Sequence, residues 1–107
     1  MRILTVCQRG NSRSVALAYI LKDGMGYDDV LACGITTTHP DTFQMLGNWA
    51  DKIFVPAEKG IYDMIPFEFR GKTVNIDIGL DRWGNPMHPE LLAISRGILE
   101  KEKDKIL

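Results

Sequence analysis

The stretch VCQRGNSRS, residues 6–14, follows a short apolar run and precedes a long helical pattern. A cysteine acts as a nucleophile only as its thiolate, and a free thiol has a pKa of about 8.5, so a catalytic cysteine needs positive partners. If a helix begins near Ser14, the helix dipole and the backbone N–H groups of residues 8 to 13 can surround an anion. The stretch therefore predicts a phosphate-binding loop with Cys7 as its nucleophile.

The residue types of the loop fit the same chemistry. Arg13 offers a planar fork of donors that matches two oxygens of a phosphate. Gly10 adopts backbone angles closed to other residues, and Asn11 tolerates them better than most. The hydroxyl of Ser14 can point back to the sulfur and stabilise its charge, whereas the side chain of Arg9 is expected at the rim. We predict that the phosphate is bound by the whole loop: Gln8, Arg9, Gly10, Asn11, Ser12, Arg13 and Ser14.

The alternative for Cys7 is a buried thiol at a strand end, the usual state of a lone cysteine. We expect this inert state for the other cysteine, Cys33, and we expect no disulfide in a reducing compartment. The two cysteines, His39 and His88 show no metal-ligand spacing, so no metal and no cofactor are predicted. His88 precedes a proline and is expected to cap a helix or lie on the surface.

Strand and helix patterns alternate along the chain and predict an α/β fold. The expected architecture is a small three-layer sandwich, with a four-stranded parallel sheet flanked by helices and the phosphate loop after the first strand. Three of the expected strands span residues 2–6, 29–33 and 72–78, and the last has the alternating pattern of an edge strand. The expected helices span residues 13–22, 40–50, 57–65 and 89–107. A threonine-rich loop, residues 34–39, is expected at the same sheet edge as Cys7.

The C-x5-R-S pattern, with Cys7 and Arg13, resembles the catalytic loop of the low-molecular-weight protein tyrosine phosphatases, in which the first strand leads directly into the loop. Gly10 and Asn11 lie one place later than the Gly and Asn of that family. The resemblance covers nearly the whole chain. It implies the three-layer fold, with residues 51–56 as its third strand, and a phosphocysteine intermediate.

The general acid that such a phosphatase needs is predicted at Asp81. The segment LDRWGN, residues 80–85, resembles the acid loop of the family, although Arg82 replaces its usual proline and Trp83 is the single aromatic residue. By this resemblance Trp83 forms a wall of the substrate pocket. The alternatives are that Asp81 is a turn residue or that Asp77, which is expected to point outward, is the acid. The form C-x2-G-x2-R-S also resembles dual-specificity phosphatases, but in that family the acid precedes the loop.

Length and composition suit one soluble domain, residues 1–107. The net charge is −1 and the pI is near 6.1, so no affinity for nucleic acid or membranes is predicted. No apolar run approaches the ~20 residues of a membrane span. We expect a cytoplasmic protein, as a monomer.

These observations predict a cysteine-dependent phosphatase. Its substrates would be a phosphorylated protein, through phosphotyrosine, or a small aryl phosphate, and inorganic phosphate and other oxyanions would be ligands. One alternative is a phosphate- or phosphoprotein-binding module with weak or no catalysis. Another is an arsenate reductase-like enzyme, which would need two more cysteines where only Cys33 is available. A sugar-transport phosphocarrier has a similar cysteine loop but little need for Arg13 and a remote acid.

Overall fold

The computed structural model describes residues 1–56, 60–79 and 82–106. Within these residues, four parallel strands form one sheet: β1 (Arg2–Cys7), β2 (Asp29–Gly34), β3 (Lys52–Pro56) and β4 (Thr73–Ile76). Their order is β2-β1-β3-β4, so β1 and β3 are central and β4 is an edge strand, as expected. The structure confirms the predicted fold class.

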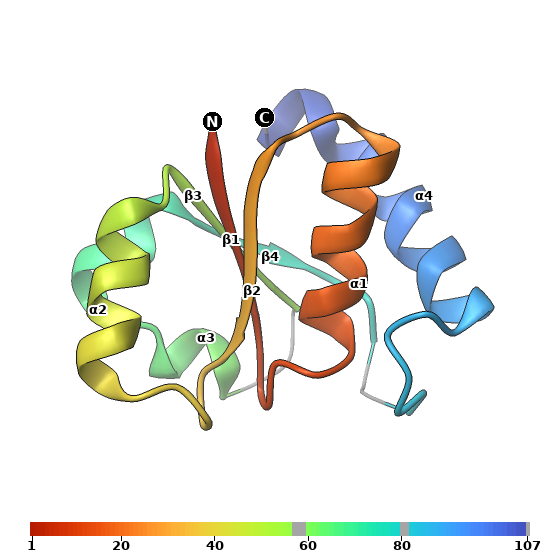
Figure 1. Cartoon of the computed structure of the whole chain (residues 1–107). Helices are drawn as coiled ribbons and strands as arrows, with labels where there is room; N and C mark the ends of the chain where they lie inside the picture. The colour runs from red at the N-terminus through yellow and green to blue at the C-terminus, as the bar shows by residue number, and fades with distance from the viewer. Residues whose placement is uncertain (57–59, 80–81, 107) are drawn as a thin grey trace.

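Helices cover both faces of the sheet and make three layers (Figure 1). One face carries α1 (Arg13–Tyr19) and α4 (Pro89–Ile106), and the other carries α2 (Pro40–Trp49) and α3 (Ile61–Met64). The described part of the chain contains no helix that is long and apolar enough to cross a membrane.

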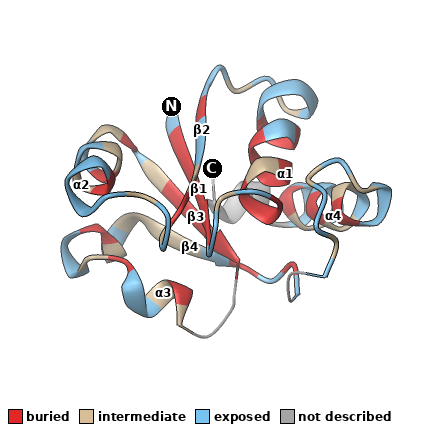
Figure 2. Cartoon of the chain, turned by 60° about the horizontal axis from the view of Figure 1, so that its bottom comes forward, coloured by how far each residue is buried: buried red, intermediate tan, exposed pale blue. Residues whose placement is uncertain are grey.

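The central strands are buried on both faces (Figure 2). Side chains of a strand alternate between the two faces of its sheet. Accordingly, Ile3 and Phe54 pack in the cluster under α1 and α4, whereas Leu4 and Ile53 pack in the cluster under α2 and α3. By the same alternation Cys7 falls on the face of α1, where its sulfur contacts the first turn of that helix.

Two segments differ from the sequence prediction. The first helix becomes a π-helical turn over Ile20–Gly24, where the N–H of Met25 bonds to the carbonyl of Ile20. In the expected helix 57–65, residues 57–59 lie outside the described residues, and α3 covers only Ile61–Met64. After α3 the structure has a 3₁₀ helix, Phe67–Lys72, which the sequence pattern did not predict. It buries Phe69 against α2.

Candidate active site

Cys7 is the last residue of β1, and only 1% of its surface is exposed. Its Sγ accepts a hydrogen bond from the backbone N–H of Gly10 at 3.1 Å and lies 3.1 Å from Oγ of Ser14. Hydrogen-bond donors stabilise a negatively charged sulfur. The structure thus brings together Cys7, Gly10 and Ser14, and it places the N–H donor of Gly10 against the sulfur.

Arg13 begins α1 and is also 1% exposed. Its Nη1 donates to the carbonyl of Gly79 at 3.2 Å. A guanidinium stays charged in a protein and presents several donors in a fixed plane. Arg13 thus places a buried positive charge at the start of α1 and connects it to the segment that follows β4.

The loop between β1 and α1 bends sharply at Gly10, which has a φ of +76°. A side chain at this position would also collide with β2, because a Cβ built on Gly10 would lie 2.4 Å from the backbone N of Gly34. Asn11 does not use the left-handed region. Ser12 precedes the helix, and its buried Oγ has no hydrogen-bond partner among the described residues.

The threonine-rich segment after β2 contacts the loop directly. We call residues 34–38 the threonine turn, which is closed by the N–H of Thr38 on the carbonyl of Gly34. The N–H of Ile35 donates to the carbonyl of Cys7 at 2.9 Å, and the N–H and Oγ1 of Thr36 both donate to that of Gln8, at 3.0 and 2.6 Å. Oγ1 of Thr37 donates to the carbonyl of Arg9 at 3.0 Å. The sequence predicted that this segment lies near Cys7, but it did not predict these bonds.

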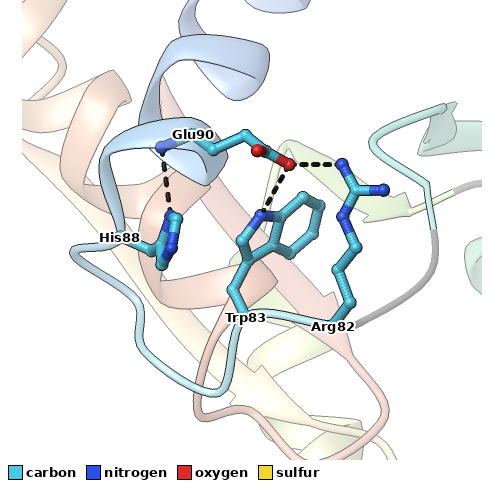
Figure 3. Close-up of polar contacts among 4 residues, drawn as sticks. All are labelled: Arg82, Trp83, His88 and Glu90. Carbon is cyan, nitrogen blue, oxygen red and sulfur yellow. Dashed lines mark hydrogen bonds and ion pairs between the residues drawn. The ribbon is translucent and has the colours of Figure 1, made fainter.

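Trp83 belongs to a polar cluster at the start of α4 (Figure 3). Its indole Nε1 donates to Oε1 of Glu90 at 3.2 Å, and Nη2 of Arg82 donates to the same oxygen. The guanidinium of Arg82 lies 4.9 Å from the centroid of the Trp83 ring. The indole and then the guanidinium lower the pKa of the Glu90 carboxyl. Nδ1 of His88 accepts from the N–H of Glu90 at 3.1 Å, which confirms its expected capping role.

Of the two candidate acids, Asp77 and Asp81, the structure describes only Asp77. Asp81 lies outside the described residues. Asp77 follows β4, is exposed as expected, and lines a shallow surface pocket with Ile98 and Lys101 of α4. The hydrogen bond from Arg13 to the carbonyl of Gly79 places Gly79 beside the end of the phosphate loop. Gly79 is two residues before Asp81 in the sequence.

Cys33 pairs with Val6 in the sheet register and is half-buried. Burial raises the pKa of its thiol to about 11, a hydrogen bond with Thr38 acts in the opposite direction, and the nearby Cys7 adds to the rise. Both cysteines are free thiols.

No protein-family model matches the sequence, and no curated protein matches it significantly. Solved structures do match over almost the whole chain. The tyrosine phosphatase Wzb from Escherichia coli K30, in complex with sulphate, superposes with a TM-score of 0.74 at 14% identity, over 99% of this chain and 98% of Wzb. The YwlE arginine phosphatase from Geobacillus stearothermophilus gives 0.70 at 19% identity, over 98% and 92%. The Erwinia amylovora tyrosine phosphatase AmsI gives 0.60 at 20% identity, over 98% and 89%.

These likenesses show that the chain has the fold of the low-molecular-weight tyrosine and arginine phosphatases, as the resemblance of its first loop predicted. At such identities they establish the fold alone.

Proposed function

We propose that the protein is a phosphatase that hydrolyses phosphomonoesters through a phosphocysteine at Cys7. The observation that carries the proposal is the position of Sγ of Cys7. It is buried at the end of β1 and lies within 3.1 Å of both the N–H of Gly10 and Oγ of Ser14, in the loop that leads to the buried Arg13. A buried thiol with these neighbours and an adjacent helix start can form and hold a thiolate beside an oxyanion.

In the proposed first step, the thiolate of Cys7 attacks phosphorus, and the bond from phosphorus to the leaving oxygen breaks. The amides of residues 8–13 and the guanidinium of Arg13 stabilise the charge on the equatorial oxygens. Asp81 donates its proton to the leaving oxygen. In the second step Asp81 takes a proton from water, which attacks phosphorus and releases inorganic phosphate. In the protein as described, Sγ of Cys7 donates to Oγ of Ser14 at 3.1 Å; once the sulfur is a leaving thiolate without a proton, the proposed role of the Ser14 hydroxyl is to donate to it.

The proposed substrate is phosphotyrosine in a protein or a similar aryl phosphomonoester. Supporting this choice, two of the structural neighbours are named tyrosine phosphatases, and one was solved with sulphate and again with phosphate. A further neighbour, a Cys-to-Ser variant of the YwlE arginine phosphatase, carries a phosphorylated active-site serine. We further propose that the protein acts as a cytoplasmic monomer without a metal, and that Trp83 lies at the wall of the substrate pocket.

Hydrolysis of p-nitrophenyl phosphate by the full chain tests the proposal, with Cys7→Ser as the inactive variant and Cys33→Ser as the matched control. We expect Cys7→Ser to abolish turnover and Cys33→Ser to retain it. Full activity in Cys7→Ser would refute the mechanism. Phosphate binding without any hydrolysis would favour a binding module. A phosphotyrosine peptide and a phosphoarginine peptide, assayed side by side, decide the substrate class.

A further inference from the structure

We propose that the threonine turn is a positioning element, which aims the amides of the phosphate loop at the bound oxyanion, and that Thr37 is its principal side chain. The identification of the bound oxyanion as part of a substrate rests on the proposed function, whereas the orientation of the loop amides does not. The turn and the loop lie side by side at the edge of the sheet where β1 and β2 end (Figure 1).

The geometry of the peptide unit relates the carbonyls that the turn binds to the directions of the loop amides. In a trans peptide, the carbonyl of one residue and the N–H of the next point in opposite directions in one plane. The threonine turn binds the carbonyls of Cys7, Gln8 and Arg9. The N–H groups of the three following residues, including Gly10, must therefore point away from the turn. Three consecutive donors therefore face away from the turn, and one of them, the N–H of Gly10, meets the sulfur of Cys7.

The N–H of Gly10 shows the result of this constraint. It shares a peptide unit with the carbonyl of Arg9, which accepts from Oγ1 of Thr37 at 3.0 Å. On the opposite side of that peptide, the N–H of Gly10 donates to Sγ of Cys7 at 3.1 Å. The hydroxyl of Thr37 thus holds the peptide that contacts the nucleophile.

Close packing of two glycines holds the turn against the loop. A Cβ built on Gly34 would lie 2.2 Å from the carbonyl carbon of Arg9 and 2.5 Å from Oγ1 of Thr37. A Cβ built on Gly10 would lie 2.4 Å from the backbone N of Gly34. The two backbones are therefore in direct contact, and a small shift of the turn would change the direction of the loop amides.

The test measures the affinity of inorganic phosphate through the protection of Cys7 from alkylation by iodoacetamide, so it needs no turnover. Thr37→Val removes the hydroxyl and keeps the shape of the side chain, and we expect it to weaken phosphate binding about fivefold, the value of one ordinary hydrogen bond. Thr37→Ser restores the hydroxyl and should bind phosphate like the original protein. Thr42→Val, on the exposed surface of α2, is the matched control and should have no effect.

Three results would contradict the positioning role of Thr37. Unchanged phosphate affinity in Thr37→Val, or equal losses in Thr37→Ser and Thr37→Val, would overturn the inference. Absence of protection in the original protein would overturn it as well, because there would be no oxyanion for the amides to bind. If phosphate protects Cys7 and Thr37→Val weakens that protection, but no phosphomonoester is hydrolysed, the positioning role stands and the proposed phosphatase activity fails.

Discussion

Replacement of Gly34 by alanine tests the contact between β2 and the phosphate loop. The new Cβ would lie 2.2 Å from the carbonyl carbon of Arg9 and 2.5 Å from its oxygen. Both atoms belong to the backbone, so no flexible side chain can move aside. Because the φ of Gly34 is not in the left-handed region, the cost is steric and not conformational. The loop or the end of β2 has to shift.

Inserting a methyl group into a packed region costs about 1–3 kcal/mol. The rigid neighbours of Gly34 place this substitution in the upper half of that range, about 2–3 kcal/mol. For a domain of this size, 1 kcal/mol lowers the melting temperature by about 4–8 °C, so we expect a fall of about 10 °C or more. Phosphate affinity should also fall, because the shift displaces the Arg9 peptide and with it the N–H of Gly10.

The matched control is Gly97→Ala. Gly97 lies in α4, is exposed, and has no atom within 4 Å of a Cβ built on it. Alanine in a helix interior is more favourable than glycine by about 0.5–1 kcal/mol, so this variant should be slightly more stable than the original protein. Thermal unfolding and phosphate protection of Cys7 are measured for both variants. If Gly34→Ala matches Gly97→Ala in both assays, the described contact between turn and loop is wrong.

Arg13→Lys should lower kcat/KM about 100- to 1000-fold although the charge is kept, because an ammonium cannot replace the planar fork; near-normal turnover would remove Arg13 from the mechanism. Asp81→Asn should slow substrates with poor leaving groups far more than p-nitrophenyl phosphate, and Asp77→Asn should not; exchanged behaviour would identify Asp77 as the acid. Burial, the largest cause of the raised pKa of Cys33, is kept in Cys7→Ser, so in that variant alkylation of Cys33 should become fast only well above the pKa of a free thiol, about 8.5. In the original protein the pKa is raised to about 11, so the stability gained from the protonated thiol should be lost as the pH rises from about 9 to about 11. Rapid alkylation of Cys33 at about pH 8, as for a free thiol, would contradict this.

Local patterns were sufficient to predict the elements that present the site. The apolar run before Cys7 and the spacing from Cys7 to Arg13 are properties of one short segment, and the structure has a strand, a bend and a helix there. The positive φ at Gly10 agrees with the conformational freedom expected of glycine. The alternation of strands and helices was likewise sufficient to predict the parallel sheet, and the alternation of apolar and polar residues within 72–78 was sufficient to predict the edge position of β4.

Features that depend on contacts distant in the sequence could not be predicted. The bonds from Thr36 and Thr37 to the phosphate loop join residues 28 positions apart, and no local pattern marks them. The 3₁₀ helix at Phe67–Lys72 buries Phe69 against Gly47 of α2, where a Cβ would lie 2.3 Å from the Phe69 ring. Nor did a local pattern indicate that the indole of Trp83 bonds to Glu90.

The central claim is that Cys7 forms a covalent bond to phosphorus during turnover. The most direct measurement is acid quenching of the reaction with an aryl phosphate within the first turnover, followed by mass spectrometry of the peptide that contains Cys7. The account predicts that this peptide carries one phosphoryl group in the original protein. The phosphorylated fraction should be larger in Asp81→Asn with p-nitrophenyl phosphate, because hydrolysis of the intermediate is slowed, and it should be zero in Cys7→Ala, which has no nucleophile at this position. Turnover by the original protein without any phosphoryl group on Cys7, together with hydrolysis of the same substrate by Cys7→Ala, would contradict it.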